Sequence, residues 1–308
     1  MYRNAVPSRQ LATWLCTALI PVLLQLAADI GWFTAGITTI VCGAAVAAVW
    51  KWGKAPNHPV FACLQYVFII VLLWNLLPHA ALSWPGDNYP AVPLILLALA
   101  AWSAHKGAAA AARVGCVLFW LVLLIYLAVL ASGTSDIKVK WLRPEVSAAP
   151  WSAATLLLIP SAVLHLRKEG NGWMPRLLLP GILLLAGTAI TAGVLSPELA
   201  DNMPNPFYTA VRSLNLLGIG QRFEAVLSAA MTAGWFAVLT ALLSTAAAHA
   251  ERIKTQWGKP GLWGTAGLAA LGMLCKLHIS WWIALILATV FWVVIPILTQ
   301  GLVDEKKW

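Results

Sequence analysis

Charged side chains are scarce in this sequence, since Asp, Glu, Lys and Arg make up only 10% of its 308 residues. Soluble globular chains carry about a quarter charged residues, which keep their surfaces in water. The scarcity of charge, together with 61% hydrophobic residues and a mean hydropathy of +0.80, excludes an ordinary soluble enzyme, a disordered chain and a collagen-like fibre. An all-α integral membrane protein is expected instead, because apolar runs long enough to cross a bilayer recur along the chain.

Motifs for catalysis and metal binding are also lacking. The sequence contains no P-loop, HExxH, nucleophile elbow, dinucleotide fingerprint or paired carboxylates. Its five cysteines include no CxxC pair, and the Cys-x-x-His spacing of Cys275 and His278 has no second pair to complete a site. We therefore expect no enzymatic activity, no catalytic residue, no metal and no cofactor, and we interpret the cysteines as small buried hydrophobic residues. The 20 Lys and Arg residues are scattered, so we expect no nucleic acid as a partner.

Apolar segments suited to membrane-spanning helices of about 20 residues occur throughout the chain. Ten are expected, at residues 11–27, 30–50, 60–83, 91–103, 113–132, 151–166, 177–196, 223–249, 262–275 and 281–299. With a cytoplasmic N-terminus, most Lys and Arg residues fall in cytoplasmic loops, which agrees with the positive-inside rule. Ten spans then place both termini in the cytoplasm, and membrane lipid is the surrounding partner.

The order of the segments predicts an inverted repeat. Five segments precede the polar connection at residues 133–150 and five follow it, so the second set starts on the opposite side of the membrane. We predict a single transmembrane domain over residues 1–308, with a first repeat at 8–132, a linker at 133–150 and a second repeat at 151–303. A short extracellular helix is expected before the eighth span.

Proline lies about ten residues into the first segment of each half, as Pro21 and Pro160. In inverted-repeat transporters such positions are broken helices whose free backbone groups bind the substrate near the midplane. The other interpretation is that each proline only kinks a packed helix. The span interiors contain no Asp, Glu, Lys or Arg, which argues against a strongly proton-coupled pump. The candidate ligand-binding residues are Thr17, Ala18, Pro21, Ser152, Thr155, Pro160 and Ser161.

Several stretches resemble the B subunits of spore germinant receptors. Residues 206–249, PFYTAVRSLNLLGIGQRFEAVLSAAMTAGWFAVLTALLSTAAAH, are similar to the family's proline-rich loop, its Arg-Ser-Ile-Asn-like helix and the Arg-(x)-Glu-Ala start of the eighth helix. The matching positions are Arg212, Ser213, Asn215, Arg222, Glu224 and Ala225. Residues 102–116, WSAHKGAAAAARVGC, are similar to a second family pattern, carried by Lys106, Gly107 and Arg113. A weaker third match is Ser8-Arg9-Gln10-Leu11 with Gly31-Trp32.

The resemblance implies a ten-helix, LeuT-like five-plus-five inverted repeat of the amino acid, polyamine and organocation transporter superfamily. It also implies a protein of the spore inner membrane that senses or carries a small nutrient such as an amino acid, together with an A-type subunit and a lipoprotein C-type subunit. Two other functions remain open, namely a free-standing amino-acid permease and a degenerate structural membrane subunit that has lost its ligand site.

The family motifs lead to two structural expectations. Arg212, Arg222 and Glu224 should lie close together on the extracellular side, where charge-assisted hydrogen bonds would join the loop helix to the eighth span. Lys106 and Arg113 should both face the cytoplasm between the fourth and fifth spans, as anchors of the topology.

Overall fold

Helices make up nearly all of the regular structure of the chain. A computed structural model describes residues 5–27, 30–53, 58–83, 91–142, 150–168, 174–196, 199–200, 202–203, 205–213 and 220–304. The α-helices are α1 (Ser8–Ala27), α2 (Trp32–Trp52), α3 (Pro59–Ala80), α4 (Ala91–His105), α5 (Ala108–Gly133), α6 (Trp151–Leu157), α7 (Ile159–Ala162), α8 (Met174–Leu195), α10 (Pro206–Ser213), α11 (Gly220–Ile253), α12 (Gly258–Leu274), α13 (Trp281–Thr289) and α14 (Ile295–Asp304). The shorter elements are β1 (Val6–Pro7), η1 (Ala81–Ser83), η2 (Thr134–Asp136), η3 (Val139–Trp141), η4 (Val163–Leu166), β2 (Arg167–Lys168), η5 (Thr255–Trp257) and the π-helix η6 (Val290–Val294).

Seven helices in the described part of the chain are long and apolar enough to cross a membrane, which agrees with the expected integral membrane protein. They cover Ser8–Leu26, Trp32–Trp52, Pro59–Ser83, Ala108–Asp136, Arg176–Leu195, Ala225–Ile253 and Trp281–Thr299. Two further apolar helices are shorter, at Ala91–His105 and Trp151–Leu166. The short helix expected before the eighth span is present as α10.

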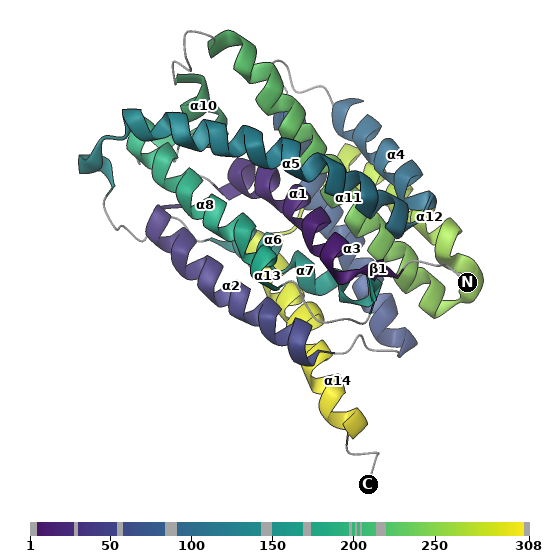
Figure 1. The fold of residues 1–308 in the computed structure, drawn as a ribbon. Helices are drawn as coiled ribbons and strands as arrows, with labels where there is room; N and C mark the ends of the chain where they lie inside the picture. Colours follow the sequence, from purple (N-terminus) through teal and green to yellow (C-terminus); the bar gives the residue numbers. More distant parts are fainter. Residues whose placement is uncertain are drawn as a thin grey trace.

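The first helix lies at the centre of the bundle. Helix α1 packs against α5, α8 and α11, and these three surround it in Figure 1. It is the most completely buried of the seven long helices. By contrast, α2, α5 and α13 expose large apolar side chains such as Ile40, Val117 and Ile286. An outer surface of this kind suits contact with lipid, so the burial pattern agrees with an integral membrane protein.

Three glycines allow the neighbouring helices to approach α1 closely. Gly115 of α5 lies against Trp14, Gly187 of α8 against Leu24, and Gly234 of α11 against Pro21. A methyl group added to Gly234 would lie 2.5 Å from Cγ of Pro21, and a methyl group on either of the others would also overlap its α1 neighbour. Small residues at helix crossings are typical of membrane proteins, where packing replaces the hydrophobic effect as the force between helices.

The break expected at Pro21 is absent, because α1 is a continuous helix through this residue. Proline removes one backbone hydrogen bond, but membrane helices tolerate this loss when neighbouring helices support them. Here the ring of Pro21 fills the space above Gly234, so the proline acts as a packing residue. The expectation of a broken first helix was therefore wrong.

Helix α3 holds the last helices in place through side-chain hydrogen bonds to their backbone. The amide nitrogen of Gln65 donates to the carbonyl of Phe291 (2.9 Å) within the π-helix η6. The phenol of Tyr66 donates to the carbonyl of Gly261 (2.9 Å), and the indole of Trp74 to that of Leu268 (3.0 Å), both on α12. These bonds give the indole, phenol and amide groups of α3 partners on α12 and η6, and so link the three elements.

The glycine contact at Pro21 leads to a stability prediction. We expect Gly234→Ala to lower the free energy of unfolding by about 1–3 kcal/mol, because the new methyl group overlaps a rigid ring that cannot rotate away. Reversible unfolding in mixed detergent micelles, followed by circular dichroism, measures the change.

Gly267→Ala is the matched control, since a methyl group at Gly267 on α12 meets nothing within 4 Å. This variant should keep or slightly raise stability, because alanine is the better helix former. Equal stability of the two variants would contradict the close contact at Gly234.

Candidate functional site

The sixth expected segment contains a broken helix. Helix α6 ends at Leu157, Leu158 forms a turn, and the chain continues as the short α7 and then as η4. Pro160 contributes to the break because its nitrogen carries no hydrogen and its ring disfavours a helical residue before it. The interruption expected from Pro160 is therefore confirmed, and the side chains on both sides of it are buried.

Side chains from other elements hold the broken segment at its C-terminal end. The indole of Trp50 on α2 donates a hydrogen bond to the carbonyl of Pro160 (3.0 Å). The guanidinium of Arg167 lies 5.1 Å from the centre of the Trp50 ring, donates to the Trp50 carbonyl (2.8 Å) and donates to the hydroxyl of Ser8 (3.1 Å). The strands β1 and β2 pair in parallel at the same place, with Val6 opposite Arg167. The break is thus coupled to the starts of β1 and α1 and to the end of α2.

The hydroxyl groups of the candidate site differ in their hydrogen bonding. Thr155 donates to the carbonyl of Trp151 (2.8 Å), one turn back in α6. Thr17 lies within hydrogen-bonding distance of the carbonyls of Thr13 (3.1 Å) and Gly115 (2.8 Å), so it faces α5 and not α6. The hydroxyl of Ser161 is buried and has no hydrogen-bond partner in the described part of the chain. Of these three hydroxyl groups, Ser161 alone is left available for a ligand.

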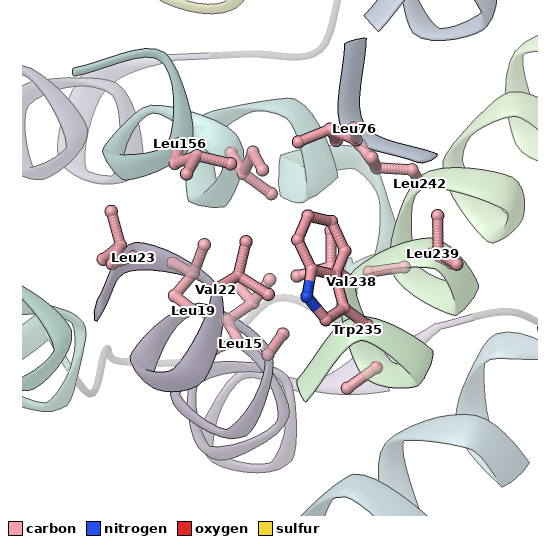
Figure 2. Close-up of a cluster of buried hydrophobic side chains, with 14 of the residues drawn as sticks. Leu15, Leu19, Val22, Leu23, Leu76, Leu156, Trp235, Val238, Leu239 and Leu242 are labelled. Carbon is pink, nitrogen blue, oxygen red and sulfur yellow. The ribbon is translucent and has the colours of Figure 1, made fainter. Parts of the chain in front are cut away.

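Apolar side chains fill the contact between α1 and the broken segment. Figure 2 shows Leu156 of α6 facing Leu19 and Leu23 of α1, with Trp235 and Val238 of α11 beside them. Among the other candidate residues, Ala18 and Pro21 are buried in α1, and Ser152 is half-buried in α6. The structure brings α1 and α6 together as expected, and their interface is a packed hydrophobic cluster.

The second family pattern lies at the turn between α4 and α5. Gly107 caps the N-terminus of α5 with a φ of 106°, a backbone conformation that favours glycine. Lys106 is exposed, with its ammonium 5.1 Å from the centre of the Trp102 ring, and Arg113 is exposed on α5. Such cation–π contacts suit residues at a membrane surface.

The expected cluster around the start of the eighth span is described only in part. Arg212 and Ser213 lie on the exposed end of α10, where the hydroxyl of Ser213 donates to the carbonyl of Ala210 (2.7 Å). Asn215 lies outside the described residues, as do the side chains of Arg222 and Glu224 in the first turns of α11. The proximity of Arg212, Arg222 and Glu224 stays a prediction.

A buried hydrogen-bond network around Gln25 joins three elements. The amide nitrogen of Gln25 donates to the carbonyl of His79 (2.8 Å), and its amide oxygen accepts from the hydroxyl of Ser83 (3.0 Å) and the indole of Trp235 (2.7 Å). The side chains of Gln25, Ser83 and Trp235 are all buried. The network therefore connects α1, the end of α3 with η1, and α11. The carbonyl oxygen of the glutamine amide accepts two hydrogen bonds, which use both of its lone pairs.

Two histidines form a second polar cluster that the sequence analysis missed. The rings of His165 in η4 and His249 in α11 lie 4.5 Å apart between centroids. Nε2 of His165 and both ring nitrogens of His249 are buried, with no hydrogen-bond partner in the described part of the chain. Arg252, three residues beyond His249, interacts electrostatically with both rings, so this position is unfavourable for a bound cation. The two histidines are far apart in the sequence, so no local pattern predicts that η4 and α11 bring them together.

Neither protein-family models nor curated proteins give a match to this chain. The fold itself defines the class, an all-helical integral membrane protein with a broken helix in its core.

The network around Gln25 gives a second prediction. We expect Gln25→Leu to reduce the free energy of unfolding by roughly 3 kcal/mol, because the indole of Trp235, the hydroxyl of Ser83 and the carbonyl of His79 lose their partner in a buried place. Chemical unfolding in detergent, monitored by circular dichroism, measures the loss.

A double-mutant cycle provides the control for this network. Trp235→Phe removes the indole donor, so the effects of Gln25→Leu and Trp235→Phe should be less than additive. Strict additivity would mean that the bond between the two side chains contributes nothing.

The unpartnered histidine pair gives a third prediction. We expect His249→Leu to raise the free energy of unfolding by about 1–3 kcal/mol, because an apolar side chain replaces two buried nitrogens that have no partner. The same exchange at the exposed His278 is the control and should change stability little. A marked loss of stability in His249→Leu would show that these nitrogens bind something in the native protein.

Proposed function

We propose that this chain is the membrane-embedded subunit of a small-nutrient receptor, similar to the B subunits of spore germinant receptors. In this proposal a molecule such as an amino acid binds at the broken helix, and the chain passes the resulting change to an A-type subunit and a lipoprotein C-type subunit in the spore inner membrane. The ten-span, LeuT-like inverted repeat with both termini in the cytoplasm belongs to the same proposal.

The observation that carries the proposal is the break at Leu158 inside the buried core. Pro160 has no N–H to donate to the carbonyl of Leu156, four residues earlier, and helix breaks of this kind are where transporters of the proposed architecture hold their substrates. Beside the break, the buried hydroxyl of Ser161 has no partner among the described residues. A ligand hydroxyl, ammonium or carboxylate could pair with this group.

The coupling to partner subunits is supported by the contacts around Arg167. These join the broken segment to β1, to α1 and to α2, so a rearrangement at the break is transmitted to segments near the chain surface. A receptor needs a connection of this kind between a ligand site and an exposed surface.

A degenerate structural subunit is the second candidate function, and a specific observation favours it. Helix α1 is continuous, and Leu19, Leu23 and Leu156 fill its contact with α6. In this alternative the chain keeps the scaffold and contributes only an interface to its partners.

A free-standing amino-acid permease is the third candidate function. Uptake of radiolabelled amino acids by proteoliposomes that contain this chain alone would favour it.

Ligand-dependent thermal stability tests the receptor proposal. The purified chain, alone and with co-expressed A-type and C-type subunits, is screened against the common amino acids by differential scanning fluorimetry. We expect at least one amino acid to raise the unfolding temperature, because a ligand that binds only the folded state stabilises it.

The variant Ser161→Ala should abolish this ligand-dependent shift and leave the protein folded. Ser228→Ala is the matched control, because Ser228 on α11 also has a buried hydroxyl with no partner in the described part of the chain. A wild-type chain that responds to no amino acid, with or without its partners, would remove the ligand claim and leave the structural subunit as the better reading. An equal shift in both variants would move the ligand away from Ser161.

A further inference from the structure

A cavity lies far along the chain from the broken helix, and its size suits a small molecule. It has a volume of about 810 Å³ and lies between the C-terminal end of α3, the start of α4 and the loop at residues 275–280 that joins α12 to α13. Pockets for small ligands typically measure about 300–1,000 Å³ and combine apolar walls with a few polar groups. The walls here include the apolar side chains of Trp74, Pro78, Met273, Leu277 and Trp281.

Hydrogen bonds hold the loop at residues 275–280 in place. The side-chain amide of Asn75 on α3 donates to the carbonyl of Ile279 and accepts from its N–H, both at 2.8 Å. The loop begins with a Schellman motif, in which the N–H of Leu277 donates to the carbonyl of Gly272 (2.8 Å) and the N–H of Lys276 to that of Met273 (3.0 Å). The wall of the cavity formed by this loop is therefore preorganised.

Lys276 occupies the position in the Schellman motif that usually belongs to glycine. Its φ is 54°, in the left-handed region that residues with a Cβ seldom adopt. Glycine would form the same turn without this strain, so the turn does not explain a lysine here. Strained residues of this kind concentrate at binding sites, where the side chain is what is required.

The described lining of the cavity carries positive charge. Lys276 contributes an ammonium group to the described wall, His79 and His278 contribute imidazoles, and no Asp or Glu is among the described lining residues. The amide of Asn75 is bonded to the loop through one N–H and through its oxygen, and the indole N–H of Trp74 is bonded to the carbonyl of Leu268. Trp74 therefore offers a ring face to a ligand, while Lys276 offers a charge.

We propose that this cavity binds a small amphiphilic anion, with its carboxylate or phosphate on the ammonium of Lys276 and its apolar body between Trp74, Trp281 and Leu277. A charge-assisted hydrogen bond fixes the anionic end, and the indole faces favour an aromatic or branched apolar group. This site is separate from the broken helix, and it stands whether or not the nutrient-receptor function is correct.

Titration calorimetry on the full chain in phosphatidylcholine nanodiscs tests the proposal. The probe is 3-phenylpropanoate, and 3-phenylpropylamine is the matched ligand with the opposite charge. We expect saturable binding of the carboxylate and none of the amine. In Lys276→Gly and Lys276→Gln the dissociation constant should rise about tenfold or more, because a charge-assisted contact is lost.

The glycine variant separates binding from folding. Lys276→Gly removes the left-handed strain, so its unfolding temperature should equal or exceed that of the wild type while binding is lost. Lys259→Gln, at the opposite end of α12, is the matched charge control and should bind as the wild type does. Wild-type affinity in Lys276→Gly, equal binding of the amine, or no saturable binding of the carboxylate to the wild type would each overturn the proposal.

A lipid arm identifies the source of the anion. The titration is repeated in nanodiscs that contain phosphatidylglycerol. A weaker affinity for 3-phenylpropanoate, measured against the phosphatidylcholine discs, would show that anionic headgroups compete for Lys276, as expected if the natural ligand is a lipid. An unchanged affinity would assign the site to a soluble anion. Both results agree with an anion site at Lys276.

Discussion

Close packing around α1 is the constraint on which the rest of the bundle depends. Water is absent from the membrane interior, so helices associate through tight contact and hydrogen bonds instead of the hydrophobic effect. Gly115, Gly187 and Gly234 bring α5, α8 and α11 close to one central helix, and the short approach at Gly115 also allows Thr17 to reach its backbone carbonyl. Helices α3, α4 and α12 then pack on α11, so their positions follow from this first layer.

The buried polar groups divide into two kinds according to their partners. The amides of Gln25 and Asn75 are bonded to backbone and side-chain groups of other elements, and such networks fix one arrangement. Buried atoms with no partner among the described residues include the hydroxyl of Ser161, Nε2 of His165 and both ring nitrogens of His249, and others lie elsewhere in the bundle, such as the hydroxyls of Tyr126 and Ser244. Unpartnered polar atoms are therefore found in several helices of the bundle, the broken segment among them.

Composition and local pattern were sufficient for the class of the protein and for much of its helix order. Apolar segments identified the long helices, and Pro160 identified the interruption in the sixth segment, because both signals act within a few residues. The same reasoning failed at Pro21, whose effect depends on Gly234 in a distant helix. The burial of the cysteines was predicted correctly for Cys16 and Cys42, whereas Cys63 and Cys275 are exposed.

The candidate site was harder to predict because its main features depend on tertiary structure. Partners such as Gln25 with Trp235, or His165 with His249, are separated by long stretches of chain, and no spacing rule relates them. Lys276 is a different case, since a local rule would place glycine at that turn and the chain has lysine. Departures from a local rule are expected where a side chain serves a purpose other than folding.

The bonds of Arg167 have a mechanical consequence. This residue attaches the C-terminal end of the broken segment to Trp50 and Ser8, while Leu158 interrupts the helix nine residues earlier in the sequence. The segment is thus interrupted at one end, at the turn, and attached to other elements at its other end, at Arg167. A movement of the segment about this turn would therefore act first on Ser8, on Trp50 and on the pairing of β1 with β2.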